Sequence, residues 1–137
     1  MNHITTSVLA KEANVPVFTV RHYTRIGLLN PSKQPSNGYK VYRDSDVKLL
    51  RFITNAKDLG FTLNEISQIL DMADHHESPC PVVREIIEKR IVENRRRIKQ
   101  MQIMQKKMEN AEKQWKSMDD EVPTGHSVCH LIESFIE

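Results

Sequence analysis

The sequence has only two cysteines and no long run of apolar residues. No uninterrupted apolar stretch approaches the roughly 20 residues that span a bilayer. The first five residues lack the charged-then-apolar pattern of a signal peptide. We therefore expect a cytoplasmic protein, in which Cys80 and Cys129 are reduced thiols, free to bind metal or to react.

The signatures of a catalytic site are also absent from the sequence. Carboxylates do not stand in pairs at catalytic spacing, there is no Gly-rich phosphate-binding loop, and no Ser-His-Asp set can be identified. The sequence therefore predicts that the protein is not an enzyme.

Residues 81–118 have the pattern of one long amphipathic helix. Their apolar residues recur at steps of three, four or a sum of the two, which is the spacing of one helical face. No Gly or Pro interrupts the segment between Pro81, which suits the first turn, and Pro123. The apolar positions are Val83, Ile87, Ile91, Ile98, Met101, Met104, Met108, Ala111 and Trp115.

Such a helix spans roughly 55 Å, at about 1.5 Å per residue. A chain of 137 residues cannot bury it inside one small domain. Pairing with a second copy is the economical way to cover the apolar stripe, so we predict a homodimer with antiparallel or parallel long helices. The three methionines of the stripe could form a soft-metal ladder, but their helical spacing favours a dimer core.

Basic residues are concentrated in the first 60 residues. This part has nine Lys and Arg against four Asp and Glu, an excess of five, whereas the formal net charge of the whole chain is +2. Such an excess suits a polyanionic partner.

The N-terminal region has the pattern of a helix-turn-helix. A threonine cap precedes a helix over residues 7–13, and Asn14-Val15-Pro16 provides a turn. A second helix then covers residues 17–26 and is closed by Gly27. The second helix is the expected recognition helix. It carries Thr19, Arg21, His22, Tyr23 and Arg25.

A small wing is expected next. Residues 31–38 contain two prolines and end in Asn37-Gly38, a strong hairpin-turn signal. Residues 28–29 and 39–42 flank this turn, so the sequence predicts them to be the two strands. Tyr39 and Lys40 lie on the second strand.

Helices and a short tail complete the chain. Asp44 is the expected cap of a third helix, which Gly60 ends, and Thr62 and Glu65 form a capping box that opens a fourth helix. The predicted fold is mainly α: a winged-helix DNA-binding domain over residues 1–70, a polar hinge over 71–80, a dimerisation helix over 81–118, and a C-terminal loop with a terminal helical turn over 119–137.

Several of these stretches resemble the MerR transcription regulators. Within residues 4–42, Thr19-Val20-Arg21-His22-Tyr23, Gly27-Leu28-Leu29 and Gly38-Tyr39-Lys40-Val41-Tyr42 resemble the DNA-binding head of that family. Residues 58–66 look like its junction between the third and fourth helices. The long helix and Cys129-His130-Leu131-Ile132 look like its metal-responsive branch. The resemblance covers essentially the whole chain.

The resemblance implies a homodimeric winged helix-turn-helix regulator whose long helices form an antiparallel coiled coil. Members bind an inverted repeat between promoter elements that are too far apart, or out of phase, for RNA polymerase. Effector binding shifts the dimer so that the DNA bends and untwists, which realigns those elements. The implied function is activation of a metal efflux or detoxification gene when a divalent metal ion binds.

The resemblance also implies which residues contact DNA. Arg21 is the best candidate for base readout, because a guanidinium can pair bidentately with guanine. Arg25, Tyr39 and Lys40 suit phosphates. Family members usually have arginine at the position of Lys40, and a lysine cannot form the same bidentate contact. For Tyr23 two interpretations are open: it contacts DNA, or it lies partly in the core. The predicted DNA-binding set is Thr19, Arg21, His22, Tyr23, Arg25, Tyr39 and Lys40.

For the effector site, the metal-sensing branch joins a cysteine at the start of the long helix to two ligands from the C-terminal loop of the other subunit. Cys80 and Cys129 match the first and last of these ligands. Branches that sense monovalent copper, silver or gold resemble this one but carry serine at the position of Cys80. The resemblance therefore implies a divalent ion, most of all zinc, with cadmium, lead or mercury as alternatives.

The middle ligand departs from the family pattern, because its position falls on Trp115. His126 is the strongest substitute, since zinc-type members have a histidine in this loop. Weaker candidates are Glu121, His130 and His76. As a solvent-facing hinge residue, His76 would have no such role, and the two cysteines could instead be small buried hydrophobic residues.

Two other functions stay open. One is a thiol sensor of the same family, in which Cys80 or Cys129 is alkylated or oxidised and no metal binds. The other is an architectural DNA-binding dimer without an effector. Replacing either cysteine would abolish a metal response, whereas a thiol sensor would need only one of them.

Overall fold

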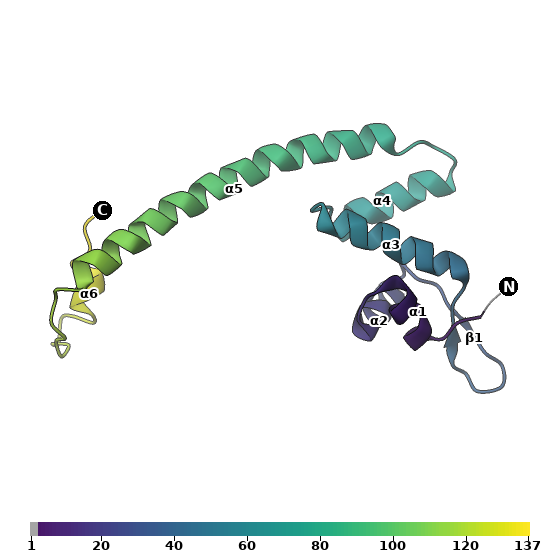
Figure 1. Ribbon diagram of the computed structural model, residues 1–137, viewed down its shortest axis with the longest axis horizontal. Coiled ribbons are helices and arrows are strands. Elements are labelled where there is room, and N and C mark those ends of the chain that lie inside the picture. The colour runs from purple at the N-terminus through teal and green to yellow at the C-terminus, as the bar shows by residue number, and fades with distance from the viewer. Residues whose placement is uncertain (1–2) are drawn as a thin grey trace. The chain divides into compact units, whose positions relative to one another are not determined.

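The computed structural model describes residues 3–137. The elements in chain order are α1 (Thr6–Ala13), α2 (Val17–Arg25), β1 (Ser32–Lys33), β2 (Lys40–Val41), α3 (Asp44–Asp58), α4 (Leu63–Asp74), α5 (Cys80–Trp115) and α6 (His130–Glu133) (Figure 1). Contacts divide the chain into two compact units, Met1–Ile87 and Glu88–Glu137. Among the described helices, none is long and apolar enough to cross a membrane.

The helix-turn-helix forms as its sequence signals predict. The Thr5 side chain accepts a hydrogen bond from the Val8 N–H at 3.3 Å and so caps α1. Asn14 adopts the left-handed conformation, with φ of 57°, and ends α1. At the other end of the motif, Gly27 has φ of +88°, which glycine adopts without strain, and the chain leaves α2 there.

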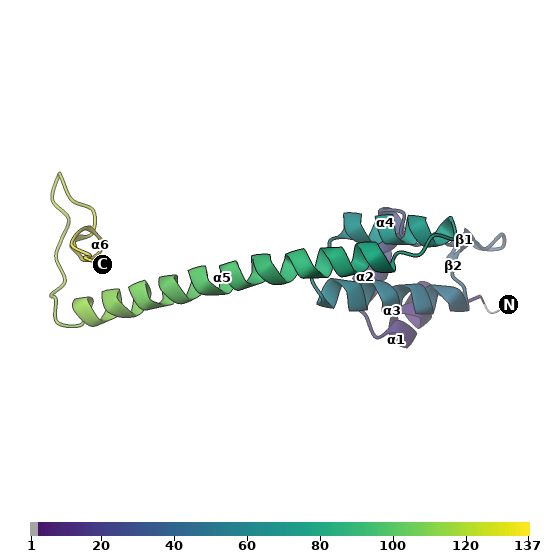
Figure 2. The same cartoon turned by 90° about the horizontal axis from the view of Figure 1, so that it is seen from above.

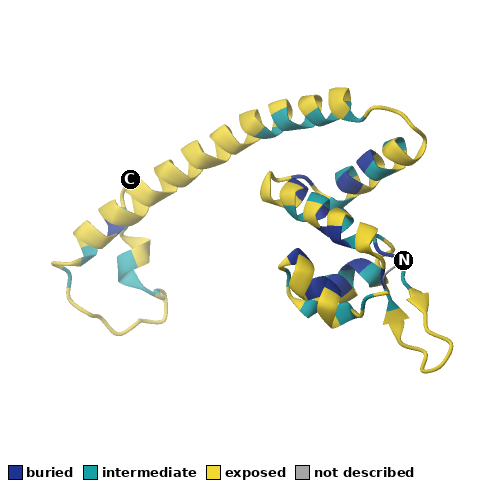
Figure 3. Cartoon of the chain, turned by 45° about the vertical axis from the view of Figure 1, so that its right-hand side comes forward, coloured by how far each residue is buried: buried dark blue, intermediate teal, exposed yellow. Residues whose placement is uncertain are grey.

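One hydrophobic core holds the first unit together. Leu9, Val20, Leu50, Ile53 and Ile66 are 0% exposed. They come from α1, α2, α3 and α4, so each of these helices buries one face against the others (Figure 3). The first turns of α5 join this core, because Val83, Ile86 and Ile87 pack against it while partly buried.

The wing forms with strands that differ from the expected ones. β1 and β2 pair antiparallel, with Lys33 opposite Lys40, and the hairpin extends from the first unit (Figures 1 and 2). The prediction of residues 28–29 as the first strand is wrong. Their N–H groups both bond to the Tyr23 carbonyl, at 2.9 and 3.2 Å, and close the end of α2. Leu29 is therefore buried in the core, at 1% exposed, and the strand starts later, at Ser32.

The third and fourth helices differ from expectation only at their ends. Asp44 is the first residue of α3, so its prediction as the cap is wrong. Arg43 is the N-cap, and the Asp46 carboxylate accepts the Arg43 N–H at 2.9 Å. The capping box of α4 is confirmed: Thr62 N–H donates to Glu65 Oε1 at 2.8 Å, and Glu65 N–H donates to Thr62 Oγ1 at 3.1 Å.

The polar hinge is shorter than expected. α4 continues to Asp74, so residues 71–74 are helical rather than part of the hinge. Met72 is half-buried there, and its carbonyl and that of Asp71 accept the His75 N–H at 3.1 and 3.2 Å. The backbone bonds of this closing turn thus extend a helix into a segment whose composition is polar.

The long helix is confirmed as a single element of 36 residues. Only Ala111 of α5 is buried, and the apolar stripe of its second half lies open to solvent (Figure 3). Ile98 is 51% exposed, Met101 64% and Met108 57%. Between Ile91 and Met108 the stripe is thus largely exposed in the single chain, whereas Ala111 near the end of the helix is buried.

Candidate DNA-binding surface and metal site

α2 separates buried from exposed side chains along its length. Val20 is fully buried and Tyr23 is 9% exposed, which fixes the inward face of the helix. Arg21 and Arg25 are exposed on the opposite side. The helix carries no acidic residue, so its outer surface repels no phosphate through a carboxylate.

His22 and Arg25 contact each other on the outer surface. Arg25 Nη2 lies 3.1 Å from His22 Nδ1. A guanidinium can only donate, so Nδ1 is the acceptor and the ring proton of the neutral His22 is on Nε2. The contact presents one more donor, the His22 Nε2–H, beside two guanidinium groups.

Tyr23 belongs to the core. Its side chain is buried among the residues of the hydrophobic core, and burial raises the pKa of its phenol above the ordinary value of 10.0. Its burial supports the alternative in which Tyr23 is partly a core residue, and a contact between Tyr23 and DNA stays a prediction. Thr19 and His22 are half-buried at the edges of the helix.

The wing is fastened to α2 through Tyr42. Its hydroxyl lies 2.8 Å from Thr24 Oγ1, which also donates to the Val20 carbonyl at 2.8 Å. Tyr42 is 1% exposed, and its backbone pairs with Ile4 at 2.7 and 3.0 Å. These bonds fix the base of the wing relative to the recognition helix.

The tip of the wing presents side chains to solvent. Tyr39 is 68% exposed and Lys40 is also exposed. The Asn37 side chain accepts the Tyr39 N–H at 2.9 Å, and the Gln34 N–H donates to the Tyr39 carbonyl at 2.8 Å. These bonds hold the turn that carries Tyr39.

Sequence reasoning missed one basic residue of the wing. Lys33 lies directly opposite Lys40, and like charges in opposed positions destabilise a pair of strands. A phosphate near both ammonium groups would remove that repulsion. The sequence does show a second lysine, Lys33, on the other side of the hairpin turn. Because the first strand was predicted at residues 28–29, the pairing of Lys33 with Lys40 was not expected.

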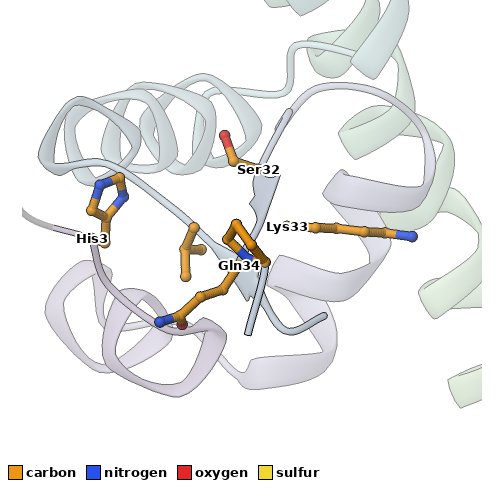
Figure 4. A pocket seen from close by; sticks show the side chains of 6 residues that line it. His3, Ser32, Lys33 and Gln34 are labelled. Carbon is orange, nitrogen blue, oxygen red and sulfur yellow. The ribbon is translucent and has the colours of Figure 1, made fainter. Parts of the chain in front are cut away.

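A pocket of about 300 Å³ lies at the base of the wing. Its lining comprises His3, Ser32, Lys33, Gln34, Pro35 and Val41 (Figure 4). It contains no acidic side chain and no thiol, so it offers a metal ion one imidazole at most.

Cys80 stands at the start of α5. It is exposed, and its backbone N–H donates to Ser78 Oγ at 3.4 Å. The thiol is therefore accessible to a metal ion, an oxidant or an alkylating agent.

Cys129 stands at the start of α6 and is held by its backbone. The Glu133 carboxylate accepts the N–H groups of Val128 and Cys129 at 3.0 and 2.8 Å. The thiol is half-buried. His126, three residues earlier, is exposed.

Two of the weaker candidate ligands bond to each other. His130 Nδ1 lies 3.3 Å from Glu121 Oε2, and His130 Nε2 lies 2.8 Å from the Asp119 carbonyl. Since a carbonyl only accepts, Nε2 carries a proton and cannot ligate a metal in this arrangement. His130 and Glu121 instead close the loop that carries His126.

The C-terminal segment is docked on the last turns of α5. The Trp115 indole N–H donates to the Leu131 carbonyl at 2.8 Å, and the Gln114 amide donates to the Ile136 carbonyl at 2.8 Å. Lys107 Nζ lies 2.6 Å from the Glu137 carboxylate. Trp115 thus occupies a structural position beneath the loop, in place of a ligand.

His75 and His76 lie where α4 ends. His75 Nδ1 bonds to the Asp71 carbonyl at 2.8 Å, and this bond, followed by the Asp71 carboxylate, raises the pKa of His75 above 6.5. His76 is exposed and has φ of 57°. Within the described residues of one chain, no three His, Cys, Asp or Glu side chains form a group able to hold a metal ion.

Comparison with known proteins identifies the family. Residues 4–73 match the MerR HTH family regulatory protein, and residues 47–111 match the family's DNA-binding region. The chain belongs to the MerR family.

MerR relatives include metal-dependent regulators. The chain is 32% identical to the transcriptional regulator ZntR of Escherichia coli over 131 residues, covering 92% of this chain and 87% of ZntR. It is 30% identical over 104 residues to a probable heavy metal-dependent transcriptional regulator of Haemophilus influenzae, covering 76% of this chain and 81% of that one.

A solved MerR-type structure shares the fold. The regulator PbrR691 of Ralstonia metallidurans, crystallised in complex with lead(II), is 25% identical, with a TM-score of 0.73. The match covers 97% of this chain and 99% of that chain. The mainly helical fold, with a DNA-binding head and a long helix, is thus confirmed, and the protein is a DNA-binding transcription regulator rather than an enzyme.

Proposed function

We propose that this MerR-family protein is a homodimeric, metal-responsive activator of a promoter in the cytoplasm. A divalent thiophilic ion, most of all zinc, binds Cys80 of one subunit together with His126 and Cys129 of the other. The ion biases the dimer toward a shape that bends and untwists an inverted-repeat operator, which brings the promoter elements into register for RNA polymerase.

The observation that carries the proposal is a pair of free thiols, one at the start of α5 and one in the C-terminal segment that follows it. Cys80 begins the helix and Cys129 follows it, at the start of α6, and both are free. Two thiolates and an imidazole are the ligands that zinc prefers. One chain does not gather three candidate ligands within its described residues, and the proposal therefore takes ligands from two chains.

The chemistry of the donors fits such an ion. Cys80 and His126 are exposed, so neither must break a core contact to reach a metal. Cys129 is half-buried, and Glu133 fixes its backbone. Water or the Glu121 carboxylate, once released from His130, would complete tetrahedral coordination.

The exposed stripe of α5 supports the dimer. Ile91, Ile98, Met101 and Met108 are each more than 40% exposed, and together they form an apolar face that water covers poorly. An antiparallel pair of these helices buries both stripes at once.

A mixed dimer tests whether the site is shared. Cys80→Ser and Cys129→Ser chains, each with a different affinity tag, are mixed and the heterodimer is purified. A shared site leaves one intact site in this dimer, so native mass spectrometry and metal–thiolate absorbance should show one tightly bound zinc ion. Each mutant homodimer should bind none.

Other results would contradict the proposal. If the heterodimer binds no zinc while the wild-type dimer binds two ions, the ligands come from one chain. If the wild-type dimer binds no zinc, cadmium, lead or mercury with its thiols reduced, the metal reading fails and the thiol sensor gains support. The exposed Cys80 thiol favours that second candidate. A Ser117→Ala homodimer controls for substitution in the C-terminal unit.

A further inference from the structure

Phe18 is an aromatic side chain left open to solvent in the first turn of α2. It is 72% exposed, two residues from Val20, which is 0% exposed. Single exposed apolar residues are ordinary on protein surfaces and need no explanation. The neighbours of Phe18 set it apart.

These neighbours are basic. Arg21, His22 and Arg25 follow Phe18 at steps of three, four and seven residues, so the four side chains share one face of the helix. All four line the same hollow in the surface of the recognition helix. An apolar ring thus lies on the face whose charges attract DNA.

The place of Phe18 along the helix determines what it can reach. The N-terminal residues of a recognition helix contact base edges in the major groove. Phe18 is the second residue of α2. A phenyl ring has no hydrogen-bonding group, and the apolar group that base edges present in the major groove is the 5-methyl of thymine.

We propose that Phe18 reads thymine, one in each half of the operator, by contact between its ring and the thymine methyl group. Arg21 and Arg25 hold the helix in the groove, and Phe18 adds preference for thymine over cytosine at its position. The inference rests on α2 being the reading helix of the proposed function.

Replacement of thymine by deoxyuracil tests the contact, because it removes only the methyl group. The full-length protein first selects its preferred duplex from a random library. Each thymine is then replaced in turn, and fluorescence anisotropy measures the affinity. We expect one symmetry-related pair of positions to weaken binding, by about fourfold for one replacement and about fifteenfold for both, since one methyl group loses its apolar contact.

Variants assign that effect to Phe18. Phe18→Ala, which removes the ring from both subunits, should bind the thymine duplex at least fifteenfold more weakly and should lose the uracil effect at this pair of positions alone. Phe18→Leu should retain part of it. Leu59→Ala, which shortens another exposed apolar side chain, 61% exposed at the end of α3, should show the wild-type pattern.

Three outcomes would overturn the inference. They are a uracil effect that persists in Phe18→Ala, no uracil-sensitive position at all, and a Phe18→Ala variant with altered self-association in sedimentation but unchanged DNA affinity. Arg21→Ala distinguishes failure of the Phe18 inference from failure of the proposed DNA surface. If Arg21→Ala also binds DNA normally, α2 is not the reading helix and the proposed DNA surface itself is wrong.

Discussion

At the scale of single residues, burial separates the side chains of α2 into a core face and an outer face. From the sequence alone, Tyr23 could lie in the core or on the outer face of the helix. It lies in the core because it occupies the same side of the helix as the buried Val20. Arg21 and Arg25 are left outside. The two charges predicted to contact DNA are therefore placed on the outer face by the apolar residues between them.

Arg21 should carry more of the DNA affinity than the other exposed basic residues of the head. We expect Arg21→Ala to weaken binding to the selected operator by about 1–3 kcal/mol, because a bidentate contact to guanine is lost. Arg21→Lys should restore little, since an ammonium cannot form that pair. Anisotropy titration at fixed salt measures the effect, with Lys48→Ala in α3 as the control for charge. Equal losses in Arg21→Ala and Lys48→Ala would argue against base readout.

Tyr42 should contribute to stability through its hydroxyl. Tyr42→Phe removes the 2.8 Å bond to Thr24 Oγ1 but leaves Thr24 bonded to the Val20 carbonyl. We therefore expect the free energy of unfolding to fall by about 0.5–1.5 kcal/mol. Urea denaturation measures this change. Tyr39→Phe is the control, because Tyr39 is 68% exposed and its loss should be near zero.

At the scale of elements, the single helix α5 passes through both buried and exposed surroundings. Its first turns pack on the core of the head through Val83, Ile86 and Ile87, whereas the stripe between Ile91 and Met108 is exposed. Its last turns carry the C-terminal segment through Trp115. One helix thus connects the DNA-binding head with the loop that bears Cys129.

Charge on the stripe should separate the subunits. Met101→Glu is expected to raise the dimer dissociation constant by at least tenfold, because pairing would bury carboxylates in an apolar interface. Analytical ultracentrifugation over a concentration series measures the constant. Gln102→Glu adds the same charge at the next position and should have a much smaller effect. A monomeric wild-type protein would contradict the predicted dimer outright.

Trp115 provides a built-in reporter of the loop. It is the only tryptophan of the chain, and its indole bonds to Leu131, two residues after Cys129. If metal binding rearranges the loop, tryptophan emission should change in proportion to bound zinc and should not change in Cys80→Ser. An emission change that persists unaltered in Cys80→Ser would place the metal away from that thiol.

At the scale of the whole molecule, the proposed shared metal site would link dimerisation to the effector. An ion held by both chains binds the dimer and not the separated subunits, so it stabilises the assembly by mass action. At a free zinc concentration of one hundred times the dissociation constant, the stabilisation is about 2.7 kcal/mol per site. Thermal unfolding with and without zinc should show a rise in Tm for the wild type and none for Cys129→Ser. Equal shifts in both would indicate binding elsewhere.

The fold of the head follows from local signals that agree with one another. The Thr62–Glu65 capping box, Gly27 after the second helix and the apolar spacing of residues 81–118 each determine an element through nearby residues alone. The basic excess before residue 60 and the motifs of the head likewise indicated DNA as the partner. These features depend on neighbours within about four positions, so a sequence displays them directly.

Tertiary contacts decided what those signals left open. Residues 28–29 looked like a strand, but closing α2 and burying Leu29 gave them another role, and β1 moved to Ser32. Tertiary contacts also assigned Tyr23 to the core and engaged His130 with Glu121 and Asp119, and α4 continued to Asp74. Each outcome depends on which distant groups compete for a side chain or a backbone bond, and spacing along the chain does not record that competition.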